Sequence, residues 1–277
     1  MSQTWQGAPY PEEDRISARG WALVLIRGPM LALTVFGGLA VLLLLRLIER
    51  PLCGLRRPVT PWITQGVCRA ALAILGLGYR VEGRPMRAVG GLVANHVSWL
   101  DIFVLNAAKR IYFVAKSEVA GWPGIGWLAR ATGTVFIARD RRQARAQKEV
   151  FEDRLLAGHK LMFFPEGTST DGRRVLPFKT TLFEAFFSQR LEHEMHMQAI
   201  SLAYHAPGGS DPRFYGWWGE MGFGPSLLRI MATAPQGRVE VVYHPPVRVD
   251  AFADRKALAR HLEGQVRAGL LDRDVLE

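Results

Sequence analysis

The fold of this chain is indicated by one stretch, GLVANHVSWLD, at residues 91–101. Its first part, Gly91–Asn95, is a short and almost continuously apolar run, which is typical of a buried strand. Ser98–Ala108 then has the pattern of a helix. Ser98 is the expected N-cap, and Asp101 follows three residues later as in a capping box. A strand that passes through a tight turn into a helix indicates an α/β domain.

The turn between this strand and helix contains His96, five residues before Asp101. Residues five apart on a continuous helix point about 140° away from each other, so the two side chains can meet only if His96 precedes the helix. Asp101 could then hold one imidazole nitrogen and leave the other as a base of fixed tautomer. The alternative is that Asp101 only caps the helix and His96 is an ordinary, partly buried histidine.

Strand-like and helix-like segments continue to alternate from about residue 79 onward. Further strands are expected at Ile111–Lys116, Thr134–Ala138, Lys160–Phe164, Met197–Tyr204 and Arg238–His244. Helical segments are expected within Gly121–Gly133, at Arg141–Ala157 and at 254–269, the last as a charged and solvated helix. Residues 79–277 show no clear linker. They are predicted to form one α/β domain with a largely buried sheet flanked by helices.

Two further segments place polar groups at the ends of strands. In FFPEGTST, residues 163–170, an apolar strand ends at a proline and is followed by Glu166 and Gly167. Glu166 and backbone amides freed by Gly167 could bind a substrate hydroxyl or a headgroup. In GTVFIAR, residues 133–139, the strand ends at Arg139, whose guanidinium could clamp a phosphate. The alternatives are a strand-to-loop turn with solvated charges and a solvated loop arginine.

Composition excludes several classes of protein. The chain has 277 residues, of which 49% are hydrophobic, and carries a net charge of +10. A disordered chain would be less apolar, and two cysteines are too few for a disulfide scaffold. Arginine supplies 29 of the 35 basic residues, which favours phosphate-bearing partners. Nucleic acids and anionic membrane surfaces both bear phosphate groups, but no nucleic-acid-binding motif accompanies the positive charge.

The apolar residues are concentrated near the N-terminus. Gly28–Leu45 is uncharged over 18 residues and is bounded by arginines, which makes it a candidate membrane span. A buried helix of a soluble domain is the alternative. Because charged residues and no small-residue cleavage site follow the run, it is expected to be retained.

A second apolar run, Pro61–Leu77, follows the first. The two could form a spanning helix with an appendage, or a hairpin in one leaflet, since Gly28-Pro29 and Gly37-Gly38 weaken the first run as one straight helix. Residues 1–78 are therefore predicted to be a polar N-terminus and membrane-anchoring helices. Five arginines beyond the first run place that side, and the α/β domain that follows it, on the cytoplasmic face of the inner membrane, near anionic headgroups. They are Arg46, Arg50, Arg56, Arg57 and Arg69.

Taken together, the three blocks resemble the lysophospholipid acyltransferase family, of the 1-acylglycerol-3-phosphate acyltransferase type. The family's NH-x4-D block is matched by Asn95, His96 and Asp101. Its Gly-x-x-Phe-Ile-x-Arg block is matched by Gly133, Phe136, Ile137 and Arg139, and its Phe-Pro-Glu-Gly-Thr block by Phe164–Thr168. Phe113–Glu118 also resembles the family's segment between the first two blocks. The family's last block, a strand with a proline, is only approximated by Gln198–Leu202, which lacks the proline.

The resemblance implies a membrane enzyme of lipid biosynthesis. His96 would take a proton from the free hydroxyl of a lysolipid, and Asp101 would orient His96. The hydroxyl oxygen would attack the thioester of acyl-CoA or acyl carrier protein, the co-substrate, with no metal and no other cofactor. Arg139 and Lys116 would hold the acceptor's phosphate. The other expected substrate-binding residues are Gly133, Glu166, Gly167 and Thr168.

The expected reaction is acylation of 1-acylglycerol-3-phosphate to phosphatidic acid. An alternative is a different lysolipid acceptor, such as lyso-ornithine lipid, on the same machinery. A more remote alternative is a non-catalytic protein that binds anionic lipid. A thioester hydrolase is disfavoured because the sequence has no G-x-S-x-G nucleophile elbow.

Overall fold

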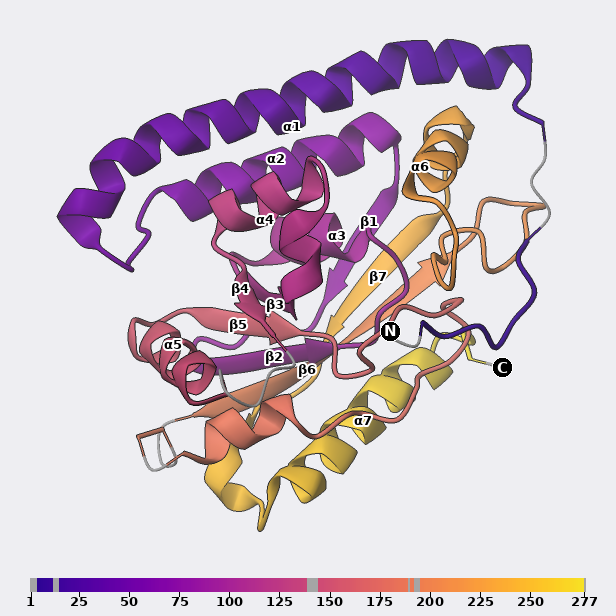
Figure 1. The fold of residues 1–277 in the computed structure, drawn as a ribbon. Coiled ribbons are helices and arrows are strands. Elements are labelled where there is room, and N and C mark those ends of the chain that lie inside the picture. Colours follow the sequence, from indigo (N-terminus) through magenta and orange to yellow (C-terminus); the bar gives the residue numbers. More distant parts are fainter. Residues whose placement is uncertain (1–3, 12–14, 139–143, 189, 192–194, 277) are drawn as a thin grey trace.

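The computed structural model describes residues 4–11, 15–138, 144–188, 190–191 and 195–276 (Figure 1). Within them the chain forms a mixed sheet with helices on both faces. The strands are β1 (Gly78–Glu82), β2 (Gly90–Ala94), β3 (Tyr112–Lys116), β4 (Val135–Ile137), β5 (Lys160–Phe163), β6 (His196–His205), β7 (Arg238–Tyr243) and β8 (Val247–Arg248). The helices are α1 (Ala18–Cys53), α2 (Thr60–Leu75), α3 (Asp101–Ala108), α4 (Ile125–Thr132), α5 (Ala144–Leu156), α6 (Phe223–Ala232) and α7 (Arg255–Leu271), with short 3-10 helices η1 (Ser117–Gly121), η3 (Leu182–Phe187) and η4 (Val249–Ala251).

The strand order is β1-β7-β6-β2-β5-β3-β4, and β8 pairs with β6. The pairs from β6 through β2, β5 and β3 to β4 are parallel, so the carboxyl ends of these strands lie at one edge. β7 runs antiparallel to β6, and β1 runs parallel to β7. Because β2 pairs directly with β5, the residues that follow these two strands become neighbours. This pairing brings the first and third sequence blocks together.

The sheet has an apolar core on each face. One core lies beneath α2, α3 and α6, and the other lies beneath α5, η3 and α7. Every residue of β2 is buried. These observations confirm the predicted α/β fold with a largely buried sheet. The expectation that 254–269 is simply solvated is wrong, because Leu258, Leu262 and Val266 of α7 are fully buried against the sheet.

Helix α1 is longer than the predicted apolar run and is not interrupted at Pro29 or at Gly37-Gly38. A single internal proline removes only one hydrogen bond from a long helix. In an apolar environment the remaining backbone groups are best satisfied within the helix. α1 packs along α2 and against α6 (Figure 1). Gly38 permits the close approach to α2, because a Cβ atom there would lie 2.3 Å from a methyl carbon of Val67.

Two polar anchors fix α1 to the rest of the fold. The carboxylate of Glu49 accepts hydrogen bonds from the backbone N–H groups of Val59 and Thr60, at 2.8 and 3.1 Å, and so caps the start of α2. Near the other end, Arg27 donates to the carbonyl oxygens of Met231 and Thr233 at 2.9 and 2.7 Å. A helix held at both ends in this way lies along the domain and does not project from it.

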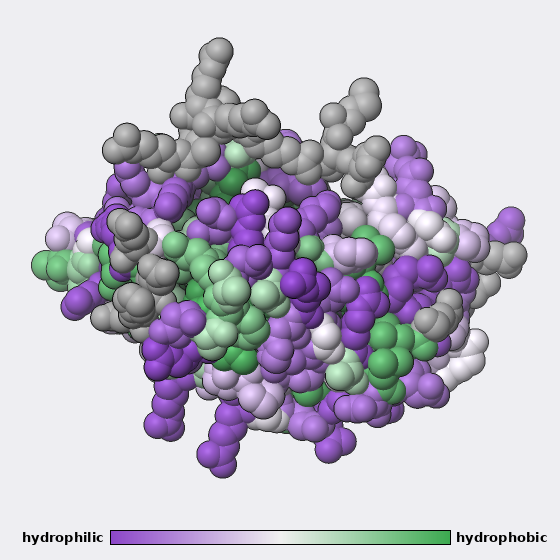
Figure 2. All heavy atoms as spheres, turned by 90° about the horizontal axis from the view of Figure 1, so that it is seen from below, coloured by the Kyte–Doolittle hydropathy of each residue, from purple (hydrophilic) through white to green (hydrophobic). Residues whose placement is uncertain are grey.

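The outward face of α1 is apolar and exposed. The helix is long and apolar enough to be a candidate membrane span, and only 6% of its most apolar window is buried. Its most exposed apolar residues are Leu25, Ile26, Leu33, Leu44, Leu47, Ile48 and Leu52. The face seen from below in Figure 1, on the side of α7, is mostly hydrophilic with smaller apolar patches (Figure 2). The exposed apolar surface of α1 is therefore the candidate membrane-facing side of the molecule.

Several elements differ from the sequence prediction. α3 begins at Asp101 and not at Ser98, and β1 and α6 were not predicted. β1 is an exposed edge strand, and α6 interrupts a loop rich in aromatic residues and glycine, so neither has a strong periodic signal. The division of the chain at residues 78 and 79 stays a prediction.

Candidate active site

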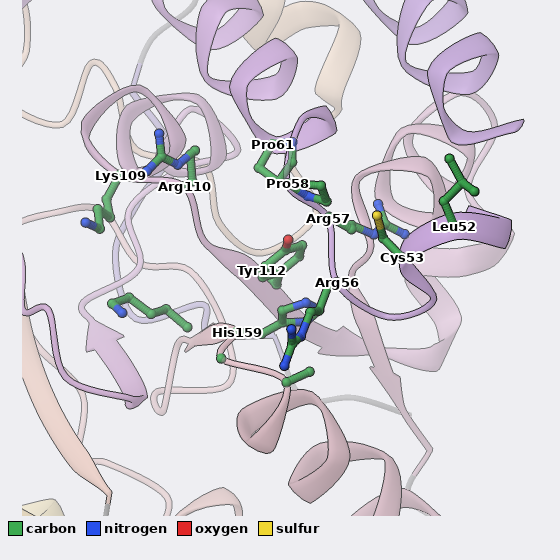
Figure 3. Close-up of a pocket in the computed structure, with 13 residues that line it drawn as sticks. Leu52, Cys53, Arg56, Arg57, Pro58, Pro61, Lys109, Arg110, Tyr112 and His159 are labelled. Carbon is green, nitrogen blue, oxygen red and sulfur yellow. The ribbon is translucent and has the colours of Figure 1, made fainter. Parts of the chain in front are cut away.

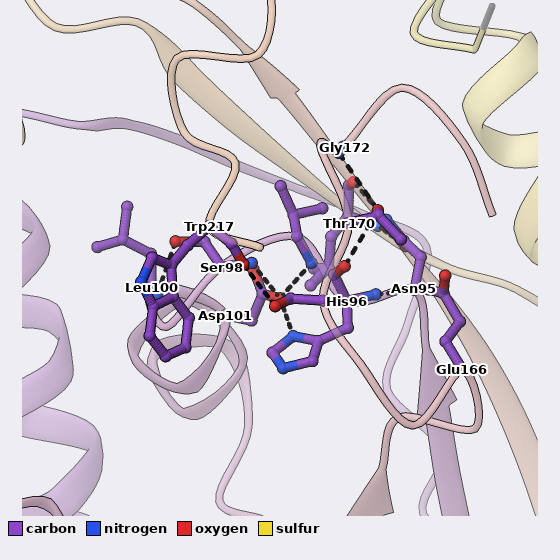
Figure 4. Close-up of polar contacts among 12 residues, drawn as sticks. Asn95, His96, Ser98, Leu100, Asp101, Glu166, Thr170, Gly172 and Trp217 are labelled. Atoms are coloured by element: carbon purple, nitrogen blue, oxygen red, sulfur yellow. Dashed lines mark hydrogen bonds and ion pairs between the residues drawn. The ribbon is translucent and has the colours of Figure 1, made fainter. Parts of the chain in front are cut away.

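His96 lies in the turn that follows β2, at the carboxyl edge of the parallel strands. Its Nδ1 atom lies 2.7 Å from Oδ2 of Asp101, in the first turn of α3 (Figure 4). The approach to this turn is fixed by Asn95, whose side-chain amide pairs with both backbone groups of Leu202 in β6, at 3.0 and 2.8 Å. The spacing argument therefore places the imidazole and the carboxylate correctly: they meet because His96 precedes the helix.

The Asp101 carboxylate is fully buried and accepts four hydrogen bonds. Besides His96, Oδ2 accepts the backbone N–H groups of Val97 and Ser98, at 2.8 and 3.1 Å. Oδ1 accepts the hydroxyl of Tyr204 at 2.7 Å. A buried carboxylate with this many donors is fixed in orientation, and its polar oxygens are all satisfied despite their burial.

The predicted capping role of Ser98 needs correction. Its hydroxyl accepts only the N–H of Leu100, at 3.3 Å, while Leu100 occupies the N-cap position of α3. The carboxylate of Asp101 accepts the backbone N–H of Ser98. This is one of the two hydrogen bonds of the expected capping box. Because the same carboxylate also binds Val97 and His96, it holds the turn open and delays the helix to residue 101.

The other side of the His96 ring is set by the third block. The ring stacks on Phe164, with centroids 3.9 Å apart and planes 9° from parallel. The side chain of His96 is 20% exposed. With Nδ1 bound to Asp101, the imidazole can act on a substrate only through Nε2. Stacking restrains the tilt of the ring, and the hydrogen bond to Asp101 fixes the tautomer that presents a basic Nε2.

Glu166 ties the third block to the first. Its Oε1 accepts the backbone N–H of His96, and its Oε2 accepts that of Leu176, both at 2.8 Å. Glu166 is 1% exposed, and burial raises its pKa to about 8 against the opposing effect of the two amides. In this structure the carboxyl group acts on the loop that carries His96. Its predicted contact with the acceptor stays a prediction.

The remaining members of the third block shape the turn beside His96. Gly167 has φ +72°, a left-handed conformation that favours glycine. The Thr168 hydroxyl accepts the backbone N–H of Trp5 at 3.3 Å, so an N-terminal segment crosses this turn. The backbone N–H of Thr170 donates to the carbonyl of His96 at 2.9 Å. Thus Gly167 and Thr168 lie near His96, and their contact with substrate stays a prediction.

The predicted members of the second block do not all reach this edge. Lys116 ends β3 and lies at the same edge as His96, where it is half-buried. Gly133 lies at the opposite edge, before β4, where it ends α4 in a left-handed conformation and its carbonyl accepts the Arg154 side chain at 2.6 Å. Gly133 therefore lies away from His96, and its contact with substrate stays a prediction. Arg139 lies outside the described residues.

Sequence reasoning missed Tyr204. Tyr204 was only the last residue of an expected strand, and nothing local distinguishes its hydroxyl from that of any other tyrosine. Its contact with Asp101 depends on β6 pairing beside β2, with Ala94 opposite Ile200. Burial and the nearby Asp101 raise the pKa of Tyr204 well above its ordinary value, so its hydroxyl stays protonated and donates to Asp101.

Among the described residues, no group of three or more His, Cys, Asp or Glu could hold a metal ion.

Comparison with known proteins gives a consistent result. A family model described as Acyltransferase matches residues 84–201, which include His96 and Glu166. The lyso-ornithine lipid O-acyltransferase of Rhodobacter capsulatus is 54% identical over 266 residues, covering 96% of each chain. The 1-acyl-sn-glycerol-3-phosphate acyltransferase of Neisseria gonorrhoeae is 33% identical, covering 74% of this chain and 79% of that one.

A solved structure shares the fold. The crystal structure of the 1-acyl-sn-glycerophosphate acyltransferase PlsC from Thermotoga maritima matches with a TM-score of 0.66 at 22% identity, covering 94% of this chain and 98% of that one. The extent and level of the sequence matches show the family as well as the fold. This chain belongs to the acyltransferase family and is an O-acyltransferase that acts on lysolipids.

Proposed function

We propose that this protein transfers an acyl chain from an acyl thioester to the hydroxyl of lyso-ornithine lipid. The observation that carries this choice is the 54% identity, over 96% of both chains, to a lyso-ornithine lipid O-acyltransferase. The relative named for 1-acylglycerol-3-phosphate is 33% identical over a shorter part. The acceptor first expected from the sequence blocks is therefore the less supported of the two, and the alternative acceptor is favoured.

The proposed mechanism uses one base and no acyl-enzyme intermediate. Nε2 of His96 accepts the proton of the acceptor hydroxyl as its oxygen attacks the thioester carbonyl carbon. The tetrahedral intermediate then expels the thiolate, which takes the proton back from the imidazolium. The negative charge of Asp101 at 2.7 Å from Nδ1 stabilises the imidazolium between these two steps. General base catalysis of this kind contributes about 10²–10⁴-fold.

The acceptor's headgroup is proposed to lie at the carboxyl edge near Lys116. Ornithine brings a carboxylate in place of a phosphate, and both are anions that lysine and arginine bind. The cation assigned to a phosphate therefore serves equally well for the proposed acceptor. The acyl donor is proposed to be acyl-CoA or acyl carrier protein, and both are tested in the assay.

Purified protein in detergent tests this proposal. Lyso-ornithine lipid and lysophosphatidic acid are each supplied with acyl-CoA and with acyl carrier protein, and products are quantified by mass spectrometry. The expected result is a kcat/KM for lyso-ornithine lipid at least tenfold above that for lysophosphatidic acid. His96→Ala serves as the catalytically inactive control. A kcat/KM that is higher for lysophosphatidic acid would show that the acceptor is assigned wrongly.

We also propose that α1 and α2 lie in the cytoplasmic leaflet of the inner membrane. This arrangement is supported by the contacts that fix α1 along the domain at Arg27 and Glu49. Ser17 caps the start of α1 and is exposed, and Cys53 ends the same helix. A membrane-impermeant maleimide should label Cys53, and a cysteine in Ser17→Cys/Cys53→Ser, only in inverted vesicles. Labelling of the two positions from opposite sides would instead show that α1 spans the bilayer.

A further inference from the structure

A cavity of about 770 Å³ lies at the amino edge of the sheet, away from His96. It forms where the connection between α1 and α2 meets the residues before β3 and before β5 (Figure 3). No Asp or Glu is among its described lining residues. Its lining includes five arginine and lysine side chains. They are Arg56, Arg57, Lys109, Arg110 and Lys160.

Three of these cations are held in place by the protein. The Arg110 guanidinium stacks over the Trp62 ring, 3.5 Å from its centroid. Arg57 donates to the carbonyl oxygen of Ala131 at 2.7 Å, and Lys160 donates to the carbonyl oxygen of Arg87 at 3.1 Å. None of these contacts neutralises charge. The cavity is therefore a preformed and positively charged site.

The proximity of the cations has an energetic cost. Burial lowers the pKa of Lys109, and the positive charges of Arg110 and Arg87 lower it further. Burial and Lys109 act in the same direction on the pKa of Lys160. The one acid of α1 that acts on Arg57, Glu49, is already engaged by Arg46 and the start of α2. An anion in the cavity would relieve this repulsion.

The wall of the cavity is neutral and aromatic. His159 stacks on Tyr112 with centroids 4.1 Å apart, and its Nδ1 accepts a hydrogen bond from Arg154 at 2.6 Å. Burial, together with Arg154 and Arg57, lowers the pKa of His159 to about 4. This histidine is therefore uncharged at neutral pH and does not add to the positive charge.

The position of the cavity separates it from the reaction. His96 follows the carboxyl end of β2, whereas the cavity lies at the amino ends of β3 and β5. A five-residue strand alone spans about 16 Å between the two edges. The cavity instead adjoins Leu52, a residue of α1 that is 76% exposed and belongs to its apolar face. It thus opens where the membrane-facing surface ends.

We propose that this cavity binds the phosphate group of an anion, either the headgroup of an anionic phospholipid or free phosphate. Arginine forks and lysine ammonium groups are the side chains that bind phosphate oxygens most strongly. A lipid headgroup would hold the enzyme at a fixed height on the membrane, with the His96 edge free for substrates. This role does not depend on which lysolipid is the acceptor.

The test uses the full chain in detergent. The variant is Arg56→Gln/Lys109→Gln, because these two side chains have no ion pair among the described residues. The matched control is Lys256→Gln/Arg260→Gln, which removes the same charge from exposed positions on α7. Native mass spectrometry measures the ratio of retained dioleoylphosphatidylglycerol to dioleoylphosphatidylcholine. Thermal unfolding with and without inorganic phosphate measures the binding of the free anion.

The native chain and the control should retain phosphatidylglycerol selectively, and the variant should lose selectivity about tenfold or more, the effect of one strong charged contact. Stabilisation by phosphate without lipid selectivity, lost in the variant alone, would assign the free anion. Equal behaviour of variant and control with both probes would overturn the proposal. So would an increased KM for acyl-CoA in the variant with unchanged binding of both probes. If the double variant fails to fold, Arg56→Gln alone is used, since Arg56 is exposed.

Discussion

Replacing Tyr204 by phenylalanine removes one hydroxyl from behind the catalytic pair. That hydroxyl donates to Oδ1 of Asp101 at 2.7 Å, and Tyr204 and Asp101 are both buried. Among the described residues Tyr204 forms no hydrogen bond with His96, so we expect it to act through the carboxylate of Asp101. We expect Tyr204→Phe to leave substrate binding intact and to weaken the positioning of Asp101.

The magnitude follows from the bond that is lost. A hydrogen bond to a charged group is worth about 1.5–3 kcal/mol. The substitution removes a single oxygen atom, so the lost hydrogen bond is the main change. Asp101 keeps three donors on Oδ2, so its charge is not orphaned. We expect the free energy of unfolding to fall by about 1.5 kcal/mol, at the low end of this range. In kcat, a similar loss corresponds to about tenfold.

The assay combines steady-state acyl transfer with thermal unfolding. kcat should fall about tenfold while KM for the acceptor stays the same. A merely structural role would lower Tm without lowering the kcat of the folded enzyme.

A matched control is available on the neighbouring strand. Tyr243 is 5% exposed, and its hydroxyl has no hydrogen-bond partner among the described residues. Tyr243→Phe therefore removes a buried hydroxyl that forms no bond, and should leave kcat unchanged and Tm unchanged or higher. If Tyr204→Phe leaves kcat unchanged, as Tyr243→Phe is expected to, the positioning role of Tyr204 is refuted.

Three other predictions concern the pair, the third block and the membrane helices. Asp101→Asn should fold but lose about 10²–10⁴-fold in kcat, because the amide cannot stabilise the imidazolium; near-native turnover in the transfer assay would contradict this. Burial raises the pKa of Glu166 to about 8, so its contribution to stability is complete below its ordinary value of 4.5 and is lost as the pH rises through 8. Subtracting the Tm profile of Glu166→Gln from the native profile should reveal this decline, and parallel profiles would exclude it. Gly38→Ala should lower Tm, because its Cβ would lie 2.3 Å from Val67, whereas Gly37→Ala, with 3.9 Å to its nearest neighbour Leu33, should not; equal Tm values would show that α1 and α2 do not pack as described.

Much of the site is local in sequence and could be predicted from it. The meeting of His96 and Asp101 depends on a turn of five residues, and its geometry follows from the helical repeat and the position of the turn. The strand that precedes His96 and the uncharged run that became part of α1 have equally strong local patterns. The third block could be placed at the end of a strand for the same reason. These features needed no knowledge of which strands are neighbours.

The tertiary structure decided what surrounds that pair. Tyr204 reaches Asp101, and Glu166 reaches the amide of His96, only because β2 lies between β6 and β5 in the sheet. Gly133 was assigned to the site because of the block it belongs to, yet it precedes β4 and so lies at the edge opposite His96. The cavity of arginine and lysine side chains likewise joins segments far apart in the chain. Sequence spacing determines contacts within one turn, whereas strand order and direction determine which distant turns share an edge.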